Sequence, residues 1–188
     1  VARAERAALE RADATSFISV RDRDLVLDGD TDYRTVIAGP ALDLDRLRPG
    51  GGQPVPDRIG FLGNLRTASN ADMVNHFARQ VLPLVRSVRR DAEFHIMGHE
   101  APRRVRKLDG LPGVRFLGSV EDQVPALESC WLTVCPLRFG SGVQNKVLES
   151  VAVGTPVVAT PQVVEALGSR AESGVLARPL ARSFAEGV

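Results

Sequence analysis

The chain has 188 residues, of which 44% are hydrophobic and 25% are charged, and its 24 basic and 23 acidic residues leave a formal net charge of +1. This composition excludes a wholly disordered chain, and the near-zero charge with only 5% aromatic residues argues against a protein built to hold nucleic acid. Two cysteines exclude a disulfide framework, and no apolar run reaches the roughly 20 residues that span a bilayer, so we expect a cytoplasmic protein.

The first part of the chain contains few elements and then a flexible stretch. We expect a helix over residues 3–12, a strand over 15–20, a polar, turn-like segment over 21–33 and a strand over 34–39. Residues 44–57 are dense in proline and glycine, which is typical of a linker. Residues 1–43 cannot bury a core alone, so we expect them to pack on the following domain or to exchange with a second copy in a homodimer.

From residue 58 the pattern becomes a regular alternation of strands and helices. Pro83 lies inside the longest helix, where it predicts a kink. Alternation of this kind predicts a parallel, Rossmann-like α/β sheet with helices on both faces, and ligands bind such sheets at the carboxyl ends of the strands. The expected strands are 58–63, 93–98, 114–118, 131–135, 155–160 and 174–177, and the expected helices are 70–90, capped by Ser69 or Asn70, 102–108, 121–129, 143–153 and 162–167.

The strongest motif is PLRFGSGVQNKVLES, residues 136–150, in which a strand, a glycine-rich loop and a helix follow one another. Glycines such as Gly140 and Gly142 let the backbone approach a phosphate, and the free amides of a helix N-terminus bind anions. Lys146, about one turn into the predicted helix, adds a positive charge suited to a diphosphate. The motif therefore predicts a phosphate site, although GxxxxGK[ST] and GxGxxG are both absent.

Two further residues of this motif have polar side chains that could reach a nucleotide bound at the predicted phosphate site. Glu149 follows Lys146 by three residues, and its carboxylate could accept hydrogen bonds from two ribose hydroxyls. Arg138 could reach the same phosphates. The alternative interpretation is structural: the glycines form a turn, and Lys146 and Glu149 are an ordinary exposed helix pair.

For two of the three histidines and for both cysteines, the sequence favours a structural role over a functional one. His95 lies inside a predicted strand, and His76 on a helix, where a surface position is expected. Three scattered histidines without other ligands at suitable spacing predict no metal site. Cys130 and Cys135 lie five residues apart on a strand, so they face opposite sides and should not pair.

Several motifs in order resemble those of a known family. RIGFLGNL, FARQVLPLVR, AEFHIMG, LPGVRFLGSVED and CPLRFGSGVQNKVLESVAVGTPVVAT, within residues 58–179, resemble the C-terminal donor-binding domain of a GT-B glycosyltransferase of group 1, or family 4. The resemblance is greatest to exopolysaccharide-associated sugar transferases. It implies that residues 1–43 are the tail of an N-terminal acceptor domain, that 44–57 are the linker, and that 58–188 are a C-terminally truncated nucleotide-sugar domain.

The resemblance also implies roles for individual residues. Glu149 matches the glutamate that holds the nucleotide ribose, and Lys146 matches the catalytic cation at the diphosphate. Many relatives carry a second glutamate where this chain has Ser141, and a lysine in the first loop, where Arg66 is the nearest cation and the second catalytic candidate. The other substrate-binding positions implied are Gly63, Asn64, His99, Ser119, Val120, Arg138, Gly140, Ser141, Gly142 and Val143.

The resemblance implies an enzyme that transfers a sugar from a nucleotide diphosphate sugar to a glycan or a lipid-linked acceptor, without metal or cofactor. A lipid-linked acceptor would place it at the inner membrane surface. Because most of the acceptor domain is missing, we expect this chain alone to bind nucleotide but to be inactive. Two alternatives stay open: a nucleotide-sugar 2-epimerase-like GT-B enzyme, and a non-catalytic, degenerate GT-B domain that acts as an assembly partner.

Overall fold

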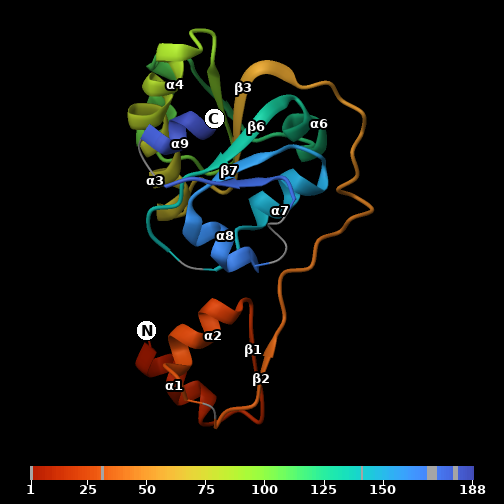
Figure 1. Cartoon of the computed structure of the whole chain (residues 1–188), viewed down its shortest axis with the longest axis vertical. Coiled ribbons are helices and arrows are strands. Elements are labelled where there is room, and N and C mark those ends of the chain that lie inside the picture. The colour runs from red at the N-terminus through yellow and green to blue at the C-terminus, as the bar shows by residue number, and fades with distance from the viewer. Residues whose placement is uncertain (1, 31, 141, 169–172, 180–181) are drawn as a thin grey trace.

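The larger part of the molecule is built around a six-stranded parallel sheet (Figure 1). The computed structural model describes residues 2–30, 32–140, 142–168, 173–179 and 182–188. The strand order is β5-β4-β3-β6-β7-β8, and every neighbouring pair is parallel, which confirms the predicted Rossmann-like fold. The strands are β3 (Val55–Leu62), β4 (Glu93–Met97), β5 (Val114–Gly118), β6 (Cys130–Cys135), β7 (Val157–Ala159) and β8 (Val175–Ala177).

Helices cover both faces of this sheet, because its strands are apolar on both sides. Figure 1 shows α3, α4 and α9 on one side and α6 and α7 on the other. Phe77 is the centre of the first layer, 4.5 Å from the ring of Phe94 and 6.4 Å from that of Phe184. The helical segments are α3 (Ala68–His76), η1 (Phe77–Val81), α4 (Leu82–Val88), α5 (Arg103–Arg106), η2 (Lys107–Gly110), α6 (Gln123–Glu128), α7 (Asn145–Ala152), α8 (Pro161–Leu167) and α9 (Arg182–Gly187).

The long helix predicted over residues 70–90 is divided by a π-helical turn. Thr67, rather than Ser69 or Asn70, caps its start and accepts a hydrogen bond from the amide of Asn70. Residues 77–81 are π-helical, and the Leu82 amide bonds to the Phe77 carbonyl five residues back. The wider turn stands immediately before Pro83, which has no amide hydrogen to donate. The interruption expected at Pro83 is therefore present as a π-turn.

The first part of the chain holds a small β-α-β unit. Strands β1 (Thr15–Phe17) and β2 (Thr35–Ile37) pair in parallel, and α1 (Ala2–Leu9) precedes them. The expectation of a turn-like segment over 21–33 is wrong, because α2 (Val20–Leu27) occupies most of it. Parallel strands need a crossover, and Ser19 caps this one by accepting a bond from the Asp22 amide.

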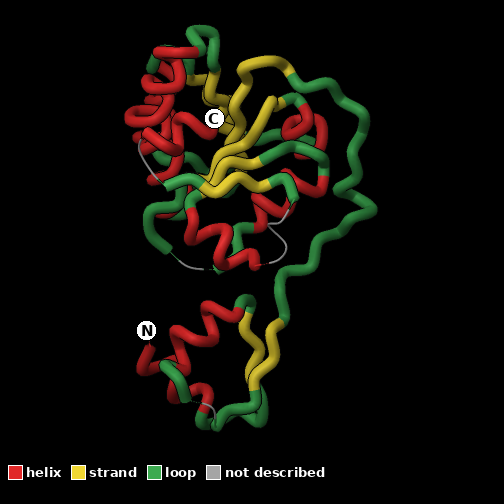
Figure 2. The backbone as a smooth tube through the Cα atoms, in the orientation of Figure 1, coloured by secondary structure: helices red, strands yellow, loops and turns green. Residues whose placement is uncertain are grey.

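The β-α-β unit contacts the larger part through α2 and α8. The Arg21 guanidinium donates to the Gln162 carbonyl and to the Glu165 carboxylate, both at 3.3 Å. Between β2 and β3 the chain crosses from one part to the other without a helix or strand (Figure 2). In the part of the chain that the structure describes, no helix has the length and apolar character needed to cross a membrane.

Candidate functional site

A cavity of about 390 Å³ opens at the carboxyl ends of β3, β4 and β5, beside the start of α7. This is the edge of the sheet at which ligands bind in parallel α/β folds. The cavity is lined by residues from the loops that follow β3, β4 and β5, by residues of α7, and by one residue of the linker. Its lining is Arg46, Leu62, Gly63, Asn64, Asn70, Gly98, His99, Ser119, Val120, Glu121, Gln123, Asn145, Lys146 and Glu149.

The floor of the cavity is made by two loops that approach each other closely. The Gly63 amide donates to the Met97 carbonyl at 3.1 Å, and the Leu65 amide donates to the His99 carbonyl at 3.1 Å. Gly98 has a φ of 153°, and a Cβ atom there would overlap the Gly63 carbonyl oxygen. These two loops can lie this close only because position 98 is a glycine.

Gly63 also leaves room for two polar side chains. A Cβ atom at Gly63 would come within 3.1 Å of Asn70 Nδ2 and within 3.2 Å of Lys146 Cε. Asn70, which is only 8% exposed, donates from Nδ2 to the Asn64 carbonyl at 2.7 Å. The Asn64 side chain accepts from the Arg66 amide at 2.9 Å. Asn70 thus shapes the first loop, a role different from the cap that its sequence position suggested.

Lys146 and Glu149 project from the first two turns of α7. Lys146 is the second residue of this helix, so it lies nearer the N-terminus than the sequence predicted. Its Nζ donates to Gln144 Oε1 at 2.8 Å and lies 5.7 Å from the centre of the Phe61 ring. Burial lowers the pKa of Lys146, against the attraction of Cys135 and Glu149. Burial raises the pKa of Glu149, against the attraction of Lys146.

These two opposite shifts share one physical cause. Removal from water disfavours the charged form of both groups, and neither has a direct partner of opposite charge within ion-pair distance among the described residues. A phosphate bound beside Lys146 would supply the negatively charged partner that the Lys146 ammonium group lacks. Hydroxyl groups entering beside Glu149 would replace the water that its carboxylate has lost.

Several predicted residues lie outside the cavity lining. Arg138 is held by the Asp72 carboxylate at 2.9 and 2.5 Å, and this pairing lowers the pKa of Asp72. Arg66 lies 3.6 Å from the Glu100 carboxylate and is highly exposed. Gly140, Gly142 and Val143 belong to the loop before α7 and do not line the cavity. Ser141 lies outside the described residues.

Histidines and cysteines take the positions expected of them, apart from one partly buried histidine. His99 lines the cavity, whereas His95 is 8% exposed and its Nε2 lies 3.0 Å from Glu93 Oε2. His76 is half-buried rather than on the surface, and burial lowers its pKa. Cys130 and Cys135 are unpaired and buried, which raises the pKa of each thiol to about 11.

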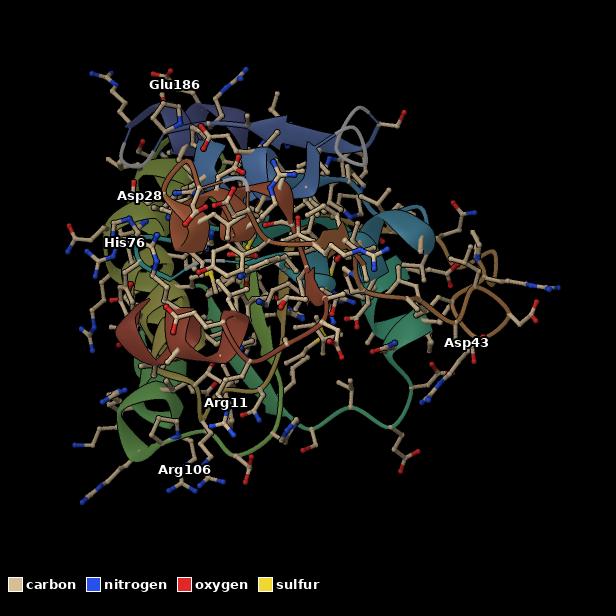
Figure 3. All side chains as sticks on the ribbon, turned by 90° about the horizontal axis from the view of Figure 1, so that it is seen from below. Arg11, Asp28, Asp43, His76, Arg106 and Glu186 are labelled. Carbon is tan, nitrogen blue, oxygen red and sulfur yellow. The ribbon has the colours of Figure 1, made fainter. Side chains whose placement is uncertain are left out.

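The charged side chains of the basic run at residues 103–107 are exposed, and Arg106 projects from the periphery in Figure 3. Within the described residues, no cluster of three or more histidine, cysteine, aspartate or glutamate side chains could hold a metal ion.

Sequence reasoning did not find seven of the cavity residues. Asn70 was noted only as a helix cap, and Gln123 lies three residues after Val120. Four others are direct neighbours of predicted residues: Leu62, Gly98, Glu121 and Asn145. Arg46 carries no signal of its own, because nothing in a proline- and glycine-rich linker indicates that it crosses a cavity. Its placement depends on how the linker packs.

Comparison with known proteins places these features in context. A family described as "Glycosyl transferases group 1" matches residues 56–188. No curated protein matches the chain in amino-acid sequence. Among solved structures, a variant of S. aureus TarM in complex with UDP and other ligands is 14% identical with a TM-score of 0.74, and the match covers 95% of this chain and 36% of TarM.

Two other solved structures share the same architecture. Anabaena HepE in complex with UDP and glucose is 14% identical with a TM-score of 0.69, covering 98% of this chain and 56% of HepE. Sucrose-phosphate synthase from Thermosynechococcus elongatus is 16% identical with a TM-score of 0.71, covering 98% of this chain and 50% of that one. At these identities the likeness shows the fold. The chain spans about a third to a half of the length of these proteins.

Proposed function

The chain belongs to the group 1 glycosyl transferases, and we propose that its cavity binds the nucleoside diphosphate sugar from which the whole enzyme transfers a sugar. The observation that carries this proposal is the arrangement of Lys146 and Glu149. A cation at the start of a helix and a carboxylate one turn later match the diphosphate and the ribose of one nucleotide.

Lys146 has the position to assist the departure of the nucleotide. When the bond between the anomeric carbon and the diphosphate oxygen breaks, the oxygen of an acceptor hydroxyl bonds to that carbon. Negative charge collects on the leaving diphosphate, whose oxygen takes up the proton that the hydroxyl loses. The amides at the start of α7 and the ammonium of Lys146 would stabilise this charge more in the transition state than in the bound substrate. Asn64 and Gly63 would border the same diphosphate from the opposite loop.

The nucleoside would extend from the diphosphate along α7. Glu149 would accept hydrogen bonds from the ribose hydroxyls, and Ser119, Val120 and His99 would border the base and the opening of the cavity. The TarM and HepE structures contain UDP. We take UDP as the nucleotide of the donor substrate on this basis.

The acceptor and the location of the enzyme follow from the same proposal. We propose a glycan or lipid-linked acceptor bound by an N-terminal domain, of which residues 1–43 are a part, with 44–57 as the linker. The enzyme would then work in the cytoplasm, at the inner membrane surface where the acceptor is lipid-linked. The isolated chain should bind nucleotide without transferring sugar, and transfer measured with the purified chain would contradict this.

A second candidate function is that of a non-catalytic donor-like domain that serves as an assembly partner. It is favoured by the positions of Arg66 and Arg138, two cations expected at the site, whose guanidinium groups engage Glu100 and Asp72 outside the cavity lining. Nucleotide binding separates the two candidates.

Calorimetric titration of the chain with UDP, GDP and ADP tests the proposal. We expect UDP to bind and Glu149→Ala to weaken that binding more than tenfold, because the ribose contacts are lost with the carboxylate. Glu165→Ala is the matched control, since Glu165 is an exposed helical glutamate on α8, outside the cavity lining. Absence of binding by all three nucleotides to the folded chain would contradict the proposal and favour the non-catalytic domain.

A further inference from the structure

The linker, which joins the two parts of the molecule, also forms a wall of the cavity through Arg46. Arg46 is exposed, and no carboxylate of the described residues lies within ion-pair distance of its guanidinium. By contrast, Arg48 on the same linker is paired with Asp45. A cation that borders a ligand cavity without a partner of its own can serve the ligand.

The backbone around Arg46 is held on both sides, so its position is defined. Asp43 accepts hydrogen bonds from the amides of Asp45 and Arg46 at 3.1 and 3.2 Å, and its carbonyl accepts from the Leu47 amide at 2.9 Å. Leu47 is 5% exposed and packs with Leu127 of α6 and Val153 at the end of α7. Arg46 is therefore attached to the wall made by these two helices.

The position of Leu47 shows which end of the cavity Arg46 borders. Along α7 the order is Lys146, Glu149 and then Val153, where the linker packs. At about 1.5 Å per residue, Val153 lies roughly 10 Å along the axis from Lys146, on the side away from the phosphate-binding end. A ligand with its diphosphate at Lys146 and its ribose at Glu149 would place its base toward Arg46.

We propose that Arg46 recognises the base of the bound nucleotide, and that it selects a base with a carbonyl edge. This inference rests on the proposed nucleotide-binding function of the cavity. A guanidinium has only donors, so it bonds well to the carbonyl oxygens of uracil or guanine. Where those bases carry a carbonyl oxygen, adenine carries an exocyclic amine, which is itself a donor and faces the guanidinium without an acceptor; only the ring nitrogens of adenine could accept from it.

Titrations of Arg46→Ala with UDP and ADP test the proposal, with Arg48→Ala as the matched control on the same linker. We expect the original chain to bind UDP more tightly than ADP. Arg46→Ala should weaken UDP about tenfold, the usual effect of losing a charged hydrogen bond, and leave ADP nearly unchanged. Arg46→Lys should recover part of the UDP affinity, and Arg48→Ala should bind as the original chain does.

The outcomes that overturn the proposal are distinct from failure of the proposed function. Equal weakening of UDP and ADP by Arg46→Ala would indicate a phosphate contact and overturn base recognition. UDP binding unaffected by Arg46→Ala would overturn any role of Arg46, while leaving the nucleotide site intact. If the original, folded chain bound neither nucleotide, the proposed function would fail and this inference with it.

Discussion

Glu128, at the end of α6, joins the linker to the larger part of the molecule. Its carboxylate is 8% exposed and accepts hydrogen bonds from the amides of Gly50, Gly51 and Gly52 at 2.5, 3.1 and 3.3 Å. A Cβ atom at Gly52 would come within 2.8 Å of the carboxylate. We predict that Glu128→Ala releases the linker while the sheet and its helices stay folded.

The size of the effect follows from these three bonds. A net hydrogen bond contributes about 0.5–1.5 kcal/mol, and the three glycines are exposed, so water competes for their amides. A total of about 2 kcal/mol is therefore appropriate, and it corresponds to roughly a 30-fold increase in the population of released linker. The core around Phe77 and Phe94 does not include Glu128, so thermal unfolding should change little.

Limited digestion with trypsin measures this population. When the linker opens and closes faster than trypsin cuts, the rate of cleavage of the Arg46–Leu47 bond is proportional to the fraction that is open. The bond after Arg48 is not a tryptic site, because Pro49 follows it. Glu128→Ala should therefore be cut about 30-fold faster, as derived above. Glu128→Gln, which keeps an acceptor oxygen, should give an intermediate rate. Glu186→Ala removes an exposed glutamate that pairs with Arg182 of its own helix, and it should match the original chain.

A cleavage rate for Glu128→Ala within about threefold of the original chain would refute this reasoning, because about threefold corresponds to less than 1 kcal/mol. The linker would then be held by Leu47 and its apolar neighbours rather than by the carboxylate. Circular dichroism must show that both chains are folded at the temperature of digestion.

Two further predictions concern the cavity. Gly98→Ala should lower the free energy of unfolding, measured in urea titrations, by about 2–5 kcal/mol, because an alanine is strained at this positive φ and its Cβ atom would overlap the Gly63 carbonyl. Gly110→Ala is the control and should be tolerated, because the space around Gly110 is open. Lys146→Met should raise the melting temperature by about 2–4 °C, since burial disfavours the ammonium, yet abolish UDP binding. Because the folded chain holds the Lys146 proton less tightly than the unfolded chain does, the original chain should gain stability as pH rises through its lowered pKa toward the ordinary 10.5, and the variant should not. A melting temperature that falls in Lys146→Met, or a Gly98→Ala chain as stable as Gly110→Ala, would contradict these arguments.

The parallel sheet could be predicted from the sequence because its central strands are apolar on both faces. Residues 157–159 are all buried, and in β6 only Trp131 is exposed; such runs are typical of strands covered by helices on two sides. α2 was not predicted because it buries only Leu27, so its sequence carries almost no helical periodicity. Its existence follows from the parallel pairing of β1 and β2, which no local pattern reveals.

The candidate site was predictable where residues follow a strand or begin a helix. Gly63, Asn64, His99, Ser119, Val120, Lys146 and Glu149 all line the cavity for this reason. Arg138 did not follow the rule, because the Asp72 carboxylate on α3 draws its guanidinium away. Contacts between side chains far apart in sequence, such as this one and the packing that places Arg46, are fixed only by the folded structure.

The π-turn at residues 77–81 has a consequence for the alignment of related sequences. A π-turn holds one more residue than the α-helical turn that it replaces, so it behaves as a single-residue insertion within a helix. Relatives that lack a proline at the position of Pro83 have no need of the wider turn. Their sequences should align with a one-residue gap near Phe77–Val81, inside a helix, where gaps are otherwise rare. An alignment that forbids this gap would shift every apolar residue on one side of the turn by one position and assign the wrong face of the helix to the core.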